Sequence, residues 1–246
     1  MAMATATPRK RKHCDFSEAT ITVLVGDAKK SFALHPTILK NNSPYFRGAL
    51  GSRFKESIDK AVRLPESDPA VFQVYATYVY TGEISLQRAG TGEDLDEESD
   101  PSYTARFHSL VKLYALADYL QDISLKNKIV DIIIDRTTGH GVLLTTLSFA
   151  FANLPAESIM CRLITDTHLT YCSAEFLEQS WSSLPEPYLK ALTLGWAKAT
   201  HDKSATPVRP DDAHRCKYHE HDEEFVQGET CVAGTRQSPP KKKAKR

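Results

Sequence analysis

Cysteine is scarce in this 246-residue chain, which contains five. Their number is odd and their spacing is wide, whereas small secreted domains held by disulfides have dense, even sets of cysteines. The basic N-terminus is not followed by the apolar core of a signal peptide, and no apolar run approaches the ~20 residues that cross a bilayer. We therefore expect a non-secreted protein in a reducing compartment, with no membrane partner.

Net charge is also absent, because 31 Lys and Arg residues balance 31 Asp and Glu residues. Residues 1–13 and 241–246 nevertheless hold nine basic residues and no acidic one, which leaves 22 basic against 31 acidic residues between them. An acidic body repels nucleic-acid phosphates, and basic tips bind phosphate only weakly and without sequence preference. Specific recognition of a nucleic acid by the folded part is therefore not expected.

Patterning divides the chain into four regions. Residues 1–13 lack periodicity and predict a disordered basic arm. Residues 14–138 predict an α+β domain with an acidic, Gly-containing loop insertion at about 88–102. Residues 139–200 keep a helical pattern and predict a C-terminal helical region, and residues 201–246 predict a mostly disordered tail.

Local signals specify the elements. A β-branched run at 20–25, a Gly26-Asp27 turn signal and an extended piece at 30–34 predict a β-hairpin. Proline after a capping residue predicts the starts of several helices, and glycine predicts one end. The predicted elements that follow are helices from His35-Pro36 and Ser43-Pro44, a strand at 61–64, a helix from Asp68-Pro69 to Gly82, and helices at 103–120, 123–138, 142–153, 155–166, 173–184 and 186–199.

Seven short motifs occur in one order along region 14–138. They are Asp15-Phe16, Phe32–His35, Leu39, Ser43–Phe46, Phe54–Ser57, Leu64–Pro69 and Tyr78–Gly82. Their collinear occurrence over about half of the chain resembles a BTB (POZ) domain of the fungal type. The resemblance implies a small sheet with a helical cluster, and a function in protein–protein interaction.

Oligomeric state stays open at this level. In many metazoan BTB proteins an amphipathic helix ahead of the first strand helps to form a strand-exchanged dimer. This chain lacks a clear amphipathic helix ahead of Asp15. A homodimer and a monomer are therefore both retained as alternatives.

Asp15 and His35 admit two interpretations, an acid–base pair or a structural pair. In the resembled family the matching positions are structural or line a partly buried charged pocket. Neither a nucleophile nor a phosphate-binding glycine loop lies near them in the sequence, so acid–base chemistry has nothing to act on. We expect a structural or pocket role for both residues, and no enzyme activity.

Phe54 and Glu56 resemble the hydrophobic-x-acid motif by which some BTB domains engage the cullin scaffold of a ubiquitin ligase. An apolar anchor would fill a pocket, and the carboxylate would orient it at the rim. The alternative is an ordinary core phenylalanine with a surface charge. Two functions follow: a nuclear adaptor that links clients to a cullin-based ubiquitin ligase, or a transcriptional co-regulator that recruits corepressor or chromatin proteins without ubiquitin transfer.

Cys216, His219, His221 and Cys231 follow a Cys-x2-His-x-His-x9-Cys spacing. Two thiolates and two imidazoles form a complete ligand set for tetrahedral Zn²⁺. Alternate residues of an extended segment share one side, which places both imidazoles together, with acidic residues 222–224 as expected partners of their second nitrogens. The alternative is a polar tail with two unrelated cysteines. No other cofactor is expected, and the His-Glu-x-x-His helix of a metallopeptidase is missing.

The C-terminal tip follows Pro239-Pro240 and resembles a monopartite nuclear import signal. Its basic residues are Lys241, Lys242, Lys243, Lys245 and Arg246. Importin grooves bind extended lysines through acidic pockets and tryptophans, and residues 9–12 offer a second basic cluster. The alternative is a solubilising or RNA-binding tail. We expect importin as a partner and the nucleus as the main location, beside a cytoplasmic fraction.

If the tips are import signals, deletion of residues 239–246 should reduce nuclear accumulation of the fluorescently tagged chain. Further removal of residues 9–12 should abolish it, because importin then has no basic cluster at either tip to bind. The nuclear-to-cytoplasmic ratio in live cells measures both effects. Full nuclear retention of the double deletion would contradict the assignment.

Overall fold

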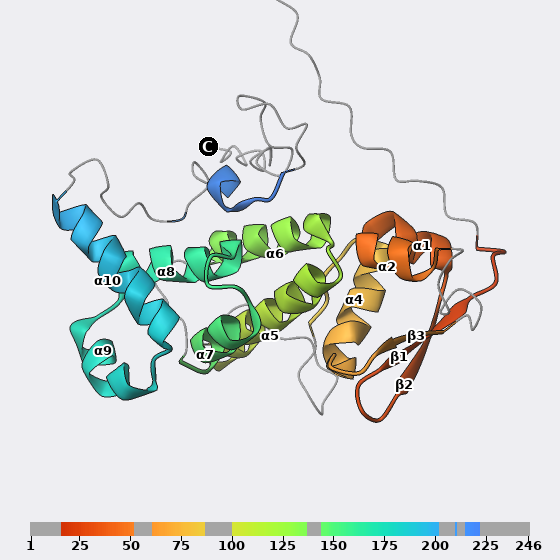
Figure 1. Ribbon diagram of the computed structural model, residues 1–246, viewed down its shortest axis with the longest axis horizontal. Coiled ribbons are helices and arrows are strands. Elements are labelled where there is room, and N and C mark those ends of the chain that lie inside the picture. Colours follow the sequence, from red (N-terminus) through yellow and green to blue (C-terminus); the bar gives the residue numbers. More distant parts are fainter. Residues whose placement is uncertain are drawn as a thin grey trace, which may run out of the picture.

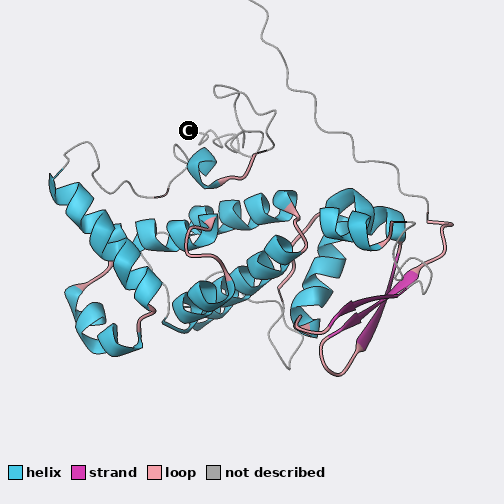
Figure 2. Ribbon diagram, in the orientation of Figure 1, coloured by secondary structure: helices cyan, strands magenta, loops and turns pink. Residues whose placement is uncertain are grey.

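A three-stranded sheet begins the described part of the chain. The computed structural model describes residues 16–51, 61–86, 100–136, 144–201, 210 and 215–221. Strand β1 (Ile21–Val25) pairs antiparallel with β2 (Lys30–Leu34) and parallel with β3 (Ala61–Leu64), which gives the order β2-β1-β3 (Figures 1 and 2). The predicted hairpin and the predicted third strand are confirmed. Gly26 lies in the turn with a φ of +73°, where a Cβ would approach Pro69 to 3.0 Å.

Three helices lie at the sheet end of the molecule (Figure 1), namely α1 (Pro36–Asn42), α2 (Pro44–Ala49) and α4 (Pro69–Thr81), and side chains cap the last two. The Ser43 hydroxyl accepts a hydrogen bond from the Phe46 N–H at 3.2 Å, and the Asp68 carboxylate accepts from the Ala70 N–H at 2.8 Å. Gly82 ends α4 in a left-handed conformation, with a φ of 75°. The predicted caps and the predicted helix end are confirmed.

Two long helices follow, α5 (Asp100–Tyr119) and α6 (Ile123–Arg136). Helix α5 begins at Asp100, so the last three residues of the predicted 88–102 insertion belong to it. Proline at position 101 is compatible with this start, because the first helical turn needs no N–H from it. The burial of α5 on two sides is confirmed. Its buried residues are Phe107, Leu110, Val111, Leu113, Tyr114, Leu116 and Ala117.

Four helices form the C-terminal region: α7 (Leu144–Asn153), α8 (Ile159–Tyr171), α9 (Ala174–Ser180) and α10 (Glu186–His201), with short 3-10 helices η1 (Trp181–Ser183) and η3 (Arg215–Tyr218). Helix α8 starts later and ends later than predicted, because Ser158 caps it and His168 is buried near its end. Helix α7 packs on α5 and α8, and α10 packs on α8. Within the described residues, none of the helices is long and apolar enough to cross a membrane.

One hydrophobic core continues from the sheet into the C-terminal helices. The same buried cluster contains Val23 of β1, Leu113 of α5, Leu147 of α7 and Leu192 of α10. The C-terminal region is therefore packed onto the sheet-containing part through α5 rather than attached as a separate core. Figure 1 shows this order along the longest axis of the molecule, with the strands at one end and α9 and α10 at the other.

A buried histidine joins two helices of the C-terminal region. His168 of α8 is 2% exposed, and its Nδ1 lies 2.6 Å from the hydroxyl of Tyr188 on α10. The Phe176 ring contacts the His168 ring edge-on at 5.7 Å between centroids. Burial lowers the pKa of His168 to about 4, because a charged imidazole would be desolvated there.

This depressed pKa predicts a loss of stability in acid. Unfolded chains protonate histidine near pH 6.5, whereas folded His168 resists protonation until about pH 4. His168 therefore makes its full contribution to the free energy of unfolding above pH 6.5. That contribution declines as the pH falls and is smaller by about 2 kcal/mol at pH 5. In urea unfolding, the difference in free energy of unfolding between wild type and His168→Gln should be smaller at pH 5 than at pH 7 by about 2 kcal/mol.

A comparison of the variant with wild type separates the effect of His168 from that of Asp122, whose effect on stability has the opposite pH dependence. Burial raises the pKa of Asp122 to about 6, so that residue binds its proton more readily in the folded state and favours folding as the pH falls. Asp122 is present in both proteins and cancels in the difference. A difference that stays constant from pH 7 to pH 5 would contradict the account.

Candidate protein-interaction site

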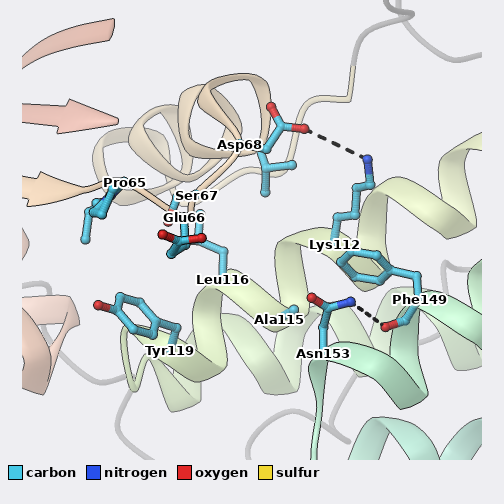
Figure 3. Close-up of a pocket in the computed structure, with 12 residues that line it drawn as sticks. Pro65, Glu66, Ser67, Asp68, Lys112, Ala115, Leu116, Tyr119, Phe149 and Asn153 are labelled. Atoms are coloured by element: carbon cyan, nitrogen blue, oxygen red, sulfur yellow. Dashed lines mark hydrogen bonds and ion pairs between the residues drawn. The ribbon is translucent and has the colours of Figure 1, made fainter. Parts of the chain in front are cut away.

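A groove opens between the β3–α4 turn and helices α5 and α7 (Figure 3). Its volume is about 360 Å³, enough for one or two side chains of a partner. Buried Leu64 and Leu116 contribute apolar surface, and Tyr119 is 54% exposed. The lining residues are Leu64, Pro65, Glu66, Ser67, Asp68, Val71, Lys112, Ala115, Leu116, Tyr119, Phe149 and Asn153.

Charges stand at one side of this groove. Lys112 Nζ lies 3.9 Å from the Asp68 carboxylate and 5.9 Å from the centre of the Phe149 ring. The two charged side chains remain 34% and 48% exposed, so their ion pair contributes no more than about 1 kcal/mol. Burial and the nearby Lys112 charge lower the pKa of His108, whose Nδ1 lies 3.0 Å from the Thr146 hydroxyl. The groove therefore offers apolar contact beside weakly paired charges that a partner can engage.

The predicted cullin-type residues Phe54 and Glu56 lie outside the described residues. Their position in the chain is defined by what flanks them, because α2 ends at Ala49 and β3 begins at Ala61. Strand β3 then leads directly to Leu64, where the wall of the groove begins. The motif thus precedes the groove by one short strand in the sequence.

His35 is held in place by Tyr80. The Tyr80 hydroxyl accepts a hydrogen bond from the His35 backbone N–H at 3.0 Å and lies 2.7 Å from His35 Nδ1. The Phe16 ring contacts the half-buried imidazole edge-on at 5.6 Å. Asp15, its predicted companion, lies outside the described residues. Sequence reasoning missed Tyr80, because a contact over 45 positions leaves no local signal.

A second, polar site lies on α6, where the C-terminal segment 215–221 contacts it (Figure 1). Arg215 is 6% exposed, and its guanidinium donates to Asp131 at 2.9 Å and to Asp135 at 2.5 Å. His219 Nε2 lies 3.0 Å from the same Asp131 oxygen. Burial raises the pKa of Asp131, but the hydrogen bonds from His219 and Arg215 outweigh burial and keep that pKa below its ordinary value.

Glu220 extends this contact toward the N-terminal end of α6. Its carboxylate lies 2.5 Å from Lys126 Nζ, which also contacts Asp118 of α5 at 2.9 Å. The backbone of Glu220 donates to and accepts from the Asn127 side chain at 2.9 and 2.8 Å. Burial lowers the pKa of Lys126, whereas the two carboxylates raise it and prevail. Segment 215–221 is therefore an ordered, docked part of the tail.

The predicted zinc ligands are only partly brought together. Cys216 Sγ lies 3.1 Å from His221 Nε2, and the rings of His219 and His221 are 6.1 Å apart. No three metal-binding side chains converge within the described part of the chain. Cys231 lies outside it, as do the basic residues 241–246. The carboxylate beside His219 Nε2 is Asp131. The acidic residues 222–224, which local spacing suggested as partners of the imidazoles, lie outside the described residues.

Comparison with known proteins identifies the fold family. The BTB/POZ domain family matches residues 9–137, more than half of the chain. Mouse Kelch-like protein 30 is 35% identical over 71 residues, which cover 29% of this chain and 12% of that protein. Human Kelch repeat and BTB domain-containing protein 4 is 32% identical over 85 residues, or 35% of this chain and 15% of that protein. Human Kelch-like protein 38 is 41% identical over 52 residues, or 21% and 9%.

A small sheet joined to a helical cluster, with a partner-sized groove between them, defines a protein-interaction module. The chain belongs to the BTB/POZ domain family, whose members act through protein–protein contacts. It spans no more than about a seventh of the curated relatives named above.

The docked segment generates a stability prediction. Arg215→Met leaves two partly buried carboxylates without their cation, which should cost about 3 kcal/mol of docking free energy. Hydrogen exchange at the amides of His219 and Glu220 should accelerate by roughly 100-fold. Lys217→Met is the matched control, because Lys217 is 51% exposed and its ion pair with Asp166 should contribute less than about 1 kcal/mol. Equal exchange rates in the two variants would contradict the docking.

Proposed function

We propose that this protein is a nuclear adaptor that links client proteins to a cullin-based ubiquitin ligase and has no catalytic site of its own. The observation that carries the proposal is the Phe54-Lys55-Glu56 motif within a chain that belongs to the BTB/POZ family. Phe54 acts as an apolar anchor, and Glu56 supplies a carboxylate at the rim of the contact. The similarity to Kelch-like protein 30 and to Kelch repeat and BTB domain-containing protein 4 supports a function in protein–protein interaction.

An adaptor needs a second surface for its client. The C-terminal helices carry two large exposed apolar side chains, Trp181 at 57% and Leu194 at 50% exposure. Tryptophan is among the residue types most enriched in interface hot spots. Helices α9 and α10 lie at the far end of the molecule from α2 and β3, the two elements that flank the motif in the sequence (Figure 1).

Substitution of Glu56 tests the adaptor function directly. Glu56→Lys replaces a rim carboxylate with a cation, and the resulting repulsion should weaken cullin binding by a few kcal/mol. In a pull-down with purified cullin, capture should fall by about 10- to 100-fold. Circular dichroism and the melting temperature should stay near wild type, because surface charge reversals usually change stability by only about 0.5 kcal/mol.

The matched control is Glu178→Lys, an equal charge reversal on an exposed position of α9. It should capture cullin like wild type. Phe54→Ala should also weaken capture. Truncation of a phenylalanine that packs in a core costs about 3–5 kcal/mol of stability, so this variant serves only as a second test after its fold has been checked. Wild-type protein that captures no cullin, or Glu56→Lys protein that captures it equally well, favours the alternative transcriptional co-regulator that recruits corepressor or chromatin proteins.

A further inference from the structure

The docked segment 215–221 contacts the rest of the protein as a bound peptide does. It lies against α6 and α8 (Figure 1), and its partners on these two helices are more than 50 positions earlier in the chain. The segment contains no aliphatic side chain, and its buried residues are Arg215, Tyr218 and His219. Arginine and tyrosine are enriched at the hot spots of protein interfaces, whereas aliphatic residues fill protein cores. The contact therefore has the composition of an interface.

Helix α8 supplies one half of the surface that receives the segment. Asp166 accepts hydrogen bonds from Lys217 Nζ and from the Tyr218 hydroxyl, both at 2.7 Å. Arg162 donates to the Lys217 carbonyl at 2.7 Å, and its guanidinium lies 6.0 Å from the centre of the Tyr218 ring. Helix α8 thus contacts both the backbone and the aromatic side chain of the segment.

The charges of this surface follow a fixed order. Asp131 and Asp135 of α6 receive the arginine of the segment. Asp166 receives the tyrosine three positions later, and Lys126 receives the glutamate two positions after that. A peptide bound in the reverse direction would bring its glutamate to the two aspartates and its arginine to the lysine, which is repulsive at both ends. We call this surface the receiving face, and it consists of Lys126, Asn127, Asp131, Asp135, Arg162 and Asp166.

We propose that the receiving face is a docking site for a linear segment of a partner protein with the order Arg-x-x-Tyr-x-Glu, and that segment 215–221 occupies it until such a partner displaces it. Ion pairs, hydrogen bonds and one aromatic ring hold the segment, so its exchange leaves the aliphatic core intact. Because the segment is tethered, it competes at an effective concentration in roughly the millimolar range. The tail therefore acts as a built-in competitor. This role is independent of whether a cullin binds.

A synthetic peptide tests the site. The probe is a fluorescent copy of residues 213–222 that carries Cys216→Ser, and the protein is the full chain with Arg215→Glu and Tyr218→Ser, which release the tethered segment. In fluorescence anisotropy, the release variant should bind the probe with a dissociation constant about 100-fold lower than wild type does, because wild type retains its competitor. Circular dichroism checks that the helices of the release variant persist.

Two controls test the chemistry of the contact. In the release variant, Asp166→Asn removes the carboxylate that receives the lysine and the tyrosine, and it should weaken probe binding by about 10- to 100-fold. Glu157→Gln is the matched substitution, because Glu157 is an exposed carboxylate just before α8, and it should leave binding unchanged. A probe with the same residues in reverse order should not bind.

Hydrogen exchange supplies a test that does not depend on the release variant. Millimolar unlabelled peptide added to wild type should accelerate exchange at the amides of His219 and Glu220, because the tethered segment is displaced. Unchanged exchange would contradict the proposal, as would a folded release variant that does not bind the probe. Equal binding of the reversed probe would reduce the contact to general charge attraction. Dimers of wild type that the release variant does not form would assign the face to a second copy of the chain, and would overturn the partner assignment.

Discussion

The corner between α5 and α6 is the constraint on which the rest of the structure depends. The Ser43 hydroxyl donates to the Leu120 carbonyl at 2.5 Å while it caps α2, so one buried side chain joins the sheet end to the helical hairpin. Asp122 is fully buried and caps α6 by accepting from the Leu125 N–H at 3.0 Å. These contacts set the direction of α6. Its apolar side then lies in the core, and its polar side presents Asn127 and Asp131 to segment 215–221.

Most of the fold follows from local signals in the sequence. Gly26, Ser43, Asp68 and Gly82 each act within a few positions, and the structure places the hairpin, the caps and the helix end where they predict. The ordered segment 215–221 could not be predicted in the same way. Its sequence is polar and without periodicity, and its partners on α6 lie more than 80 positions away. Tertiary contacts, rather than local propensity, decide its structure.

The candidate sites also combine residues that local sequence signals indicate with residues that only tertiary contacts bring together. The spacing of Cys216 and His221 could be recognised in the sequence, because both the type of metal-donor residue and its position are known there. The carboxylate beside His219 was not, since Asp131 belongs to a helix 88 positions earlier. The groove was missed because it is a shape formed by the β3–α4 turn, α5 and α7, and no residue in it is unusual alone. Phe54 and Glu56 remain a prediction that rests on the motif.

The central claim is that this BTB/POZ protein works by bringing proteins together, with a cullin ligase as one of them. The most direct measurement is affinity purification of the tagged full chain from nuclear extract, followed by quantitative mass spectrometry. The account predicts that cullin and RING subunits co-purify in near-equal amounts with the chain. Corepressor or chromatin proteins recovered without any cullin would contradict it.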